Sequence, residues 1–207
     1  MKRIFQSTTL FVAIAAVVVS CASPKLKTIE NLKAAITGET GASASYKAFS
    51  AKAADEGYHN IAKMFAAASA AEAIHVKNHN DVLVLMNEEA FNPTAGTPEV
   101  NSTIANIEAA IKGETYEFTV MYPGFIETAI AEDCMDALVS FDMASDAEAV
   151  HAKLYAEALE ILKTTGTDEA VASVWYVCPK CGNLFNTVED VGACSICGVG
   201  STSFRVF

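Results

Sequence analysis

Two short motifs in an alanine-rich region each place a glutamate three residues before a histidine. They are EAIH at residues 72–75 and EAVH at residues 148–151, and this spacing puts both side chains on one helix face. Two further glutamates, Glu39 and Glu114, stand in a repeated GET sequence. A single motif of this kind is more typical of a solvated helix face, but carboxylates and imidazoles repeated in this way could bind metal ions.

The neighbours of these acidic residues are mainly alanine, isoleucine and valine. A carboxylate in such surroundings is costly unless it is paired or metal-bound. One Glu from each of two helices and a Glu-x-x-His from each of two others is the ligand pattern of a di-iron carboxylate site. Oxygen ligands with one imidazole per metal favour iron or manganese over zinc or copper. We therefore predict a dimetal site whose ligands are Glu39, Glu72, His75, Glu114, Glu148 and His151, with Glu117 as an additional seventh carboxylate.

The elements that must position these ligands are helices, because apolar residues recur at helical spacing throughout the region. The turn DEGYHN at 55–60 and the loop at 87–99 with its two prolines interrupt the pattern. We predict four helices, over residues 28–56, 59–87, 99–131 and 135–163. Pro123 falls inside the third helix and is expected to kink it.

The helical region reads as one helix hairpin written twice. Glu39 corresponds to Glu114 with an offset of 75, and the two Glu-x-x-His motifs correspond with an offset of 76. Short turns within each half and a long middle loop predict a ferritin-like four-helix bundle over residues 28–163. A glycine inside a helix costs about 1 kcal/mol relative to alanine. We therefore expect Gly38 and Gly113 to let a neighbouring helix approach closely or to ease the local helix geometry.

The C-terminal region, residues 172–207, has a different character, with aromatic and β-branched residues and many glycines. It contains two CxxC pairs: Cys178 with Cys181, and Cys194 with Cys197. Four thiolates at this spacing suit a tetrahedral zinc or iron ion in a small β-rich module. The spacing alone leaves a structural zinc ribbon open, and a pair of disulfides is a further alternative. The remaining Cys134 is expected to be a small buried apolar residue.

The N-terminus has the pattern of an export signal. Lys2 and Arg3 precede a short apolar stretch, which ends at VVSC with Cys21. This ending resembles a bacterial lipobox, so we predict a lipoprotein-type signal over residues 1–21 and a lipidated Cys21; a plain secretory signal is the alternative. Because Ala22 rather than Asp follows, the resemblance suggests a periplasm-facing anchor in the outer membrane of a Gram-negative bacterium. The net charge of −11 argues against nucleic-acid partners.

Residues 30–163 resemble the rubrerythrins, and the two CxxC pairs complete the resemblance over nearly the whole mature chain. The motifs that carry it are GET at 38–40, EAIH at 72–75, GETYEF at 113–118, MYPGF at 121–125 and EAVH at 148–151. The resemblance implies a mainly α fold in which the bundle is followed by a rubredoxin-like four-cysteine module. It also implies two irons in the bundle and one iron in the tail, where zinc stays possible on the spacing alone. Ser195 stands where the family has proline, a departure that bears on the redox potential of the tail iron, because backbone N–H bonds to sulfur help to set it.

The resemblance assigns a role to each ligand. Glu72 and Glu148 would bridge the metals, Glu39 and Glu114 would be terminal ligands, and His151 would hold the second iron. Glu117 would exchange with His75 as the first iron shifts between oxidised and reduced states.

The resemblance also gives roles to two tyrosines, Tyr46 and Tyr122, which would hydrogen-bond ligand carboxylates; packing aromatics with a wet hydroxyl are the alternative. The other two histidines, His59 and His79, are expected at the surface.

The activity that the resemblance implies is reduction of hydrogen peroxide to water at the di-iron centre, with electrons entering through the tail iron and its four cysteines. It further implies a homodimer in which the tail of one subunit serves the bundle of the other. No dinucleotide-binding glycine motif occurs in the sequence, so the electron donor would be a separate, unknown protein. Two rival functions stay open: an iron-binding ferroxidase, and an envelope adaptor with a zinc ribbon.

Overall fold

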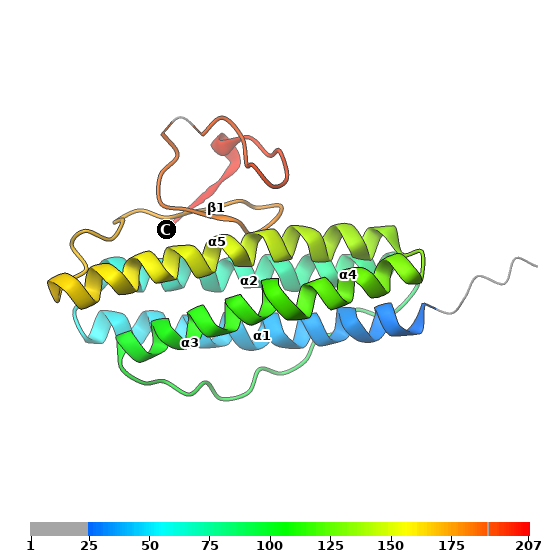
Figure 1. The fold of residues 1–207 in the computed structure, drawn as a ribbon, viewed down its shortest axis with the longest axis horizontal. Coiled ribbons are helices and arrows are strands. Elements are labelled where there is room, and N and C mark those ends of the chain that lie inside the picture. The colour runs from blue at the N-terminus through cyan, green and yellow to red at the C-terminus, as the bar shows by residue number, and fades with distance from the viewer. Residues whose placement is uncertain (1–24, 190) are drawn as a thin grey trace, which may run out of the picture.

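The computed structural model describes residues 25–189 and 191–207 (Figure 1). The predicted signal and Cys21 lie outside these residues. The helices are α1 (Leu26–Asp55), α2 (His59–Leu85), α3 (Thr103–Tyr116), α4 (Tyr122–Ala131) and α5 (Met135–Thr165). No helix in the described ranges is long and apolar enough to cross a membrane.

The helices form the predicted four-helix bundle, in which α3 and α4 together make the third long helix (Figure 1). Tight turns join the two helices of each half: Gly57 has a positive φ of 88° between α1 and α2, and Asp133 has a φ of 52° between α4 and α5. The long connection between Leu85 and Thr103 links the two halves along the outside of the bundle.

The third long helix differs from the prediction in two respects. It begins at Thr103 rather than at residue 99, and it contains a π-helical segment, Glu117–Met121, shortly before Pro123. The backbone N–H of Tyr122 donates to the carbonyl of Glu117, five residues earlier. Proline has no backbone N–H to donate to the carbonyl four residues earlier in a helix. The π-turn inserts one extra residue shortly before this proline. The third long helix therefore continues as α4, which contains Pro123.

The apolar core has two parts, one on each side of the middle of the bundle. One contains Phe49, Phe65 and Tyr155, and the other contains Leu32, Phe141 and the buried Cys134. The expectation that Cys134 is a buried apolar residue is confirmed, since its side chain is 3% exposed. Polar ligands lie between the two apolar parts, away from water.

The tail returns along the bundle after α5 ends at Gly166, whose φ is 74°. The Asp168 carboxylate then accepts hydrogen bonds from the backbone N–H groups of Asn60 and Ile61, at 2.6 and 3.1 Å, which satisfies the N-terminus of α2. Three short strands follow, β1 (Tyr176–Val177), β2 (Leu184–Phe185) and β3 (Arg205–Val206), in the antiparallel order β2-β1-β3. The module lies over α2 and α5 (Figure 1).

Candidate metal centres

Four helices bring six of the predicted ligands together in the middle of the bundle. α1 supplies Glu39, α2 supplies Glu72 and His75, α3 supplies Glu114, and α5 supplies Glu148 and His151; all six are at most 1% exposed. They form two groups of four, in each of which the potential ligand atoms lie within 4.8 Å of one another. Glu72 and Glu148 belong to both groups, so their carboxylates are placed to bridge two metal ions.

The distances within the site follow the same division. His75 Nδ1 lies 2.7 Å from Glu148 Oε1 and 2.9 Å from Glu72 Oε2. His151 Nδ1 lies 2.7 Å from Glu148 Oε2 and 3.4 Å from Glu72 Oε1. Each bridging carboxylate thus turns one oxygen toward each histidine.

These short distances are not hydrogen bonds. Eight ligand atoms are buried without a hydrogen-bond partner in the described structure: both oxygens of Glu72 and Glu148, one oxygen each of Glu39 and Glu114, and Nδ1 of His75 and His151. Buried polar atoms left unpaired are costly, and here their lone pairs converge on common space. This donor set fits two iron ions.

The buried negative charge of the site also favours bound cations. Burial and the nearby Glu148 carboxylate raise the pKa of Glu39 to about 7, and burial and the same carboxylate raise the pKa of Glu114 well above its usual range. Burial lowers the pKa of His151, but the Glu148 and Glu72 carboxylates outweigh it and raise that pKa to about 10. Without metal ions, protons must offset the negative charge; bound cations would take their place.

Glu117 lies next to the site but outside both groups of four. Burial, together with the Glu39 carboxylate, raises the pKa of Glu117 to about 10. Its Oε1 atom lies 3.8 Å from the position that a β-carbon on Gly38 would take. The structure therefore has His75, and not Glu117, among the converging ligands. A β-carbon on Gly113 would meet nothing within 4 Å, so no helix approaches this glycine closely; the alternative, that the glycine eases the local helix geometry, stays a prediction.

The two tyrosines connect the halves of the bundle. Tyr46 of α1 donates a hydrogen bond to Glu114 Oε1 of α3, at 2.6 Å, and Tyr122 of α4 donates to Glu39 Oε1 of α1. Burial raises the pKa of both phenols well above its usual range, so both stay protonated donors. Each terminal carboxylate has one oxygen held by a tyrosine and the other free to face a metal ion.

The expectation that His79 lies at the surface is wrong, whereas His59 is exposed as expected. The His79 ring is fully buried, with Nδ1 2.8 Å from Ser140 Oγ and Nε2 3.1 Å from the Tyr122 hydroxyl. Burial lowers its pKa to about 3, so the imidazole is neutral. The signal in the sequence is its spacing of four from His75, which puts it on the same helix face.

The four tail cysteines converge as predicted, with ligand sulfurs within 4.8 Å of one another. Cys178 Sγ lies 3.3 Å from Cys197 Sγ, and Cys181 Sγ lies 3.5 Å from Cys194 Sγ. A disulfide has an S–S distance of about 2.05 Å, so these thiols are free and the disulfide alternative is not supported. Four sulfurs in this arrangement fit one iron ion or one zinc ion.

The cysteine loop touches the dimetal site directly. The Cys181 carbonyl lies 2.9 Å from His75 Nε2, and the Gly182 carbonyl lies 3.1 Å from His151 Nε2. A carbonyl only accepts, so each Nε2 carries a proton, and each Nδ1 would offer its lone pair to a bound metal ion. The tail thus packs on the bundle of its own chain; the homodimer with exchanged tails that the resemblance implies stays a prediction.

The comparisons with known proteins agree with both centres. The family model for rubrerythrin matches residues 30–159. The chain belongs to the rubrerythrin family. It is 39% identical over 180 residues to nigerythrin of Nitratidesulfovibrio vulgaris, which covers 87% of this chain and 86% of that protein. It is 35% identical over 184 residues to rubrerythrin-2 of Clostridium acetobutylicum, covering 87% and 96% of the two chains.

Solved structures extend the rubrerythrin likeness to the fold. The fully reduced, all-ferrous state of nigerythrin superposes with a TM-score of 0.80 at 37% identity, covering 87% of this chain and 86% of that one. Bacterioferritin of Mycobacterium tuberculosis superposes with a TM-score of 0.61 at 18% identity over 67% of this chain and 87% of that one, a likeness in fold alone. The predicted fold class is confirmed.

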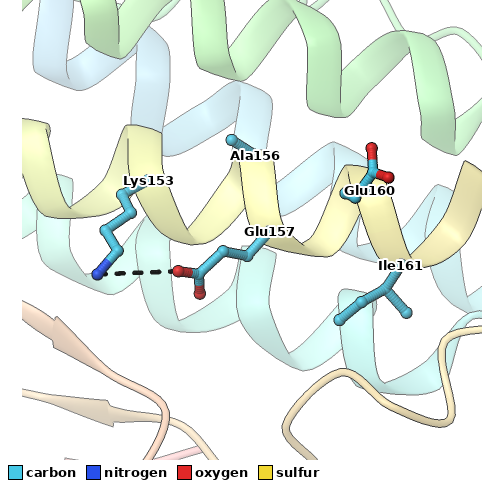
Figure 2. A pocket seen from close by; sticks show the side chains of 5 residues that line it. All are labelled: Lys153, Ala156, Glu157, Glu160 and Ile161. Atoms are coloured by element: carbon cyan, nitrogen blue, oxygen red, sulfur yellow. Dashed lines mark ion pairs between the residues drawn. The ribbon is translucent and has the colours of Figure 1, made fainter.

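Two surface hollows of this rubrerythrin family member differ in their relation to the metal centres. A hollow of about 570 Å³ on the outer side of α5 is lined by side chains that include the Lys153–Glu157 ion pair, at 3.8 Å, and no predicted ligand (Figure 2). A hollow of about 210 Å³ between α1 and α3 is lined by Tyr46, Gly113 and Glu117 together with small residues. Only the second of these leads toward the dimetal site.

Proposed function

We propose that this chain is a di-iron peroxidase that reduces hydrogen peroxide to water with electrons supplied through its four-cysteine module. The observation that carries the proposal is the pairing of the two centres. The ligand histidines His75 and His151 hydrogen-bond the backbone of the loop that holds Cys181. A storage protein would need no such second metal centre beside its first.

The chemistry requires two electrons and two protons for each peroxide: H2O2 + 2e⁻ + 2H⁺ gives 2H2O. When bound, the two ferrous ions supply one electron each, so the O–O bond is cleaved without release of a hydroxyl radical. Glu72 and Glu148, which belong to both groups of converging ligands, would hold both ions. Tyr46 and Tyr122 orient the terminal carboxylates through hydrogen bonds to one oxygen of each.

The hollow between α1 and α3 provides the entrance for peroxide. Its wall combines small side chains such as Ala42 and Ala110 with the larger side chains of Tyr46, Phe49 and Glu117. Glu117 is the carboxylate that the family resemblance places in exchange with His75. Because it lies between the hollow and the converging ligands, it can move toward the first metal position when His75 leaves.

The electron route runs from the cysteine sulfurs through the Cys181 and Gly182 peptides to the ligand histidines. The contact is within one chain, so a single subunit contains the complete route. The donor that reduces the four-cysteine module is a separate protein. A homodimer is the assembly that the resemblance implies, and it could keep this contact within a subunit or exchange it between subunits.

We also propose that Cys21 is lipidated and anchors the chain to the cell envelope, facing the periplasm. The support is the sequence of residues 1–21. α1 begins five residues after Cys21, a span of about 18 Å at most, so an anchored bundle would stand close to the membrane. Cys21→Ser should abolish incorporation of labelled fatty acid and move the protein from the membrane fraction to the soluble fraction. Labelling that survives in this variant would contradict the anchor.

Peroxide turnover by protein purified without oxygen tests the proposed activity. We expect the oxidised protein to be red from a ferric tetrathiolate, and the reduced protein to regain this colour when peroxide is added. Two electrons should be consumed for each peroxide. Peroxide that leaves the reduced bundle irons ferrous would contradict a peroxidase. Oxidation by oxygen alone, with storage of ferric iron, would favour a ferroxidase.

A further inference from the structure

A third hollow, of about 250 Å³, lies between α2 and α5 beside the tail. Its lining includes Ser140 at its inner side and the carboxylates of Asp81 and Asp136 on the exposed helix surfaces. Ser140 is 5% exposed and its hydroxyl also hydrogen-bonds His79, which is fully buried. Ser140 therefore links this hollow to the interior of the bundle.

From Ser140, an unbroken line of hydrogen bonds leads to a predicted metal ligand. His79 Nδ1 lies 2.8 Å from Ser140 Oγ, His79 Nε2 lies 3.1 Å from the Tyr122 hydroxyl, and that hydroxyl donates to Glu39 Oε1. Because the Tyr122 proton is used for Glu39, the Tyr122 oxygen must accept from His79 Nε2–H. His79 Nδ1 then accepts from the Ser140 hydroxyl, so all the donors point toward Glu39.

The equivalent positions in the other half of the bundle have no such line. With the offset of 76, His79 corresponds to Tyr155 and Ser140 corresponds to Met64. Both are fully buried, and the Tyr155 hydroxyl makes no hydrogen bond among the described residues. The fold by itself therefore does not require a polar pair at this place, since a phenol and a thioether pack there in the other half.

We propose that Ser140, His79 and Tyr122 form a proton relay from the hollow between α2 and α5 to Glu39 at the dimetal site. A hydronium ion in the hollow gives a proton to Ser140 Oγ and becomes water, as the Ser140 proton passes to His79 Nδ1. The proton on His79 Nε2 passes to the Tyr122 oxygen, the Tyr122 proton passes to Glu39 Oε1, and Glu39 gives its proton to an oxygen of the peroxide. Ser140, His79, Tyr122 and Glu39 each gain one proton and lose one; the hydroxyls then rotate and the imidazole turns over before the next transfer.

The relay rests on the proposed function, because peroxide reduction consumes two protons at a site whose six converging ligands are at most 1% exposed. It assigns a use to a buried histidine that holds no metal. The relay also gives peroxide and protons separate routes to the dimetal site. Peroxide enters between α1 and α3, and protons enter between the other two long helices, α2 and α5.

Two variants and a matched control test the relay. Ser140→Ala removes the hydroxyl with little change in volume, and His79→Leu removes the imidazole. Tyr155→Phe alters the symmetry-related position, where no hydrogen bond is lost. All three should retain the iron content of the parent. We expect both relay variants to slow reoxidation of the reduced protein by peroxide about 100-fold, the low end for a positioned proton-transfer group. Tyr155→Phe should match the parent.

A second readout does not depend on turnover. The chain has four histidines, so ¹⁵N-histidine spectra of the metal-free protein resolve the His79 ring N–H. We expect this proton to exchange with D2O more slowly in Ser140→Ala than in the parent or Tyr155→Phe. Equal exchange rates in all three proteins would overturn the relay, as would slow reoxidation in His79→Leu alone. A parent that does not reduce peroxide, but shows Ser140-dependent exchange, would instead contradict the proposed function.

Discussion

The two ligand histidines and the two terminal glutamates are each held by a second group that fixes which atom faces the metal position. The Cys181 and Gly182 carbonyls fix the histidine tautomers, and Tyr46 and Tyr122 each occupy one oxygen of a terminal glutamate. The remaining lone pairs have no partner in the described structure and turn inward. The site is thus preorganised at the level of single atoms.

Tyr46→Phe removes the support from Glu114. Its Oε1 atom loses a hydrogen bond of 2.6 Å in a buried place, so the carboxylate can rotate away from the metal position. We expect iron affinity at the bundle site to fall about 10- to 100-fold, the range for loss of an outer hydrogen bond to a ligand. Competition with an iron chelator measures this, with Tyr155→Phe as the control. Unchanged affinity would show that Glu114 is held by packing alone.

The ligands of the two Glu-x-x-His motifs could be predicted from the sequence, because a spacing of three puts both side chains on one helix face. His79 could not, because its neighbours Asn78 and Asn80 are polar and suggest a solvated face. Its burial depends on contacts with Ser140 and Tyr122, which lie 61 and 43 residues away in the sequence. The burial of His79 is therefore set by tertiary packing and cannot be predicted from its neighbours in the sequence.

At the scale of elements, the π-segment explains why the two halves do not match with one offset. Glu39 and Glu114 differ by 75, but Tyr46 and Tyr122 differ by 76. One extra residue therefore lies between Glu114 and Tyr122, where the structure has its π-helix, Glu117–Met121. A π-turn is a one-residue insertion in an α-helix and is frequent at functional sites. The change of offset was present in the sequence and would have located this segment.

Carboxylates from neighbouring helices also cap the helices that carry ligands. Glu56 accepts a hydrogen bond from the backbone N–H of Thr103, at 2.9 Å, at the start of α3, and Glu132 accepts one from Thr28, at 2.8 Å, in α1. A carboxylate at a helix N-terminus satisfies an unpaired donor and the helix dipole. These contacts fix where α1 and α3 begin, and with them the positions of Glu39 and Glu114.

Glu56→Gln should therefore destabilise the bundle in a pH-dependent way. Hydrogen bonds from Thr103 lower the pKa of Glu56 to about 2 in the folded protein, below its unfolded value of 4.5. Its stabilisation is present above pH 4.5 and is lost as the pH falls toward 2. Near neutral pH we expect the free energy of unfolding in urea to fall by about 1 kcal/mol, as for a lost helix cap.

The difference in stability between Glu56→Gln and the parent should vanish as the pH approaches the folded pKa of about 2; a difference that persists there would contradict this origin. Glu127→Gln, at an exposed position of α4, is the control.

At the scale of the whole molecule, the tail is an integral part of the metal site rather than an appendage. Asp168 attaches the linker to the start of α2, and the cysteine loop closes over His75 and His151. The two CxxC pairs predicted a metal module, but their docking face depends on contacts over more than a hundred residues, as between His75 and Cys181. Sequence spacing carries no information about such a contact, so only the structure gives it.

Gly182→Ala tests the docking of the tail. Gly182 has a φ of 79°, and a β-carbon there would lie 2.4 Å from His75 Nε2 and 3.1 Å from the Ala71 carbonyl oxygen. The cysteine loop must therefore move away from the bundle. We expect the variant to keep its tail iron. Electron transfer to the bundle irons, followed by stopped-flow absorbance, should be at least about tenfold slower, since the contact that orients both centres is lost.

Gly192→Ala, where a β-carbon would meet nothing within 4 Å, should match the parent. Equal transfer rates in Gly182→Ala would show that electrons take another route.

The most direct measurement is the iron content per chain of protein purified without oxygen, for the parent and for Glu148→Gln. Glu148 belongs to both groups of converging ligands, so its loss should empty both bundle positions and leave the tail iron in place. We expect three irons per parent chain and one per Glu148→Gln chain. A parent with a single iron, or a variant that keeps all three, would show that these buried side chains do not hold a pair of metal ions.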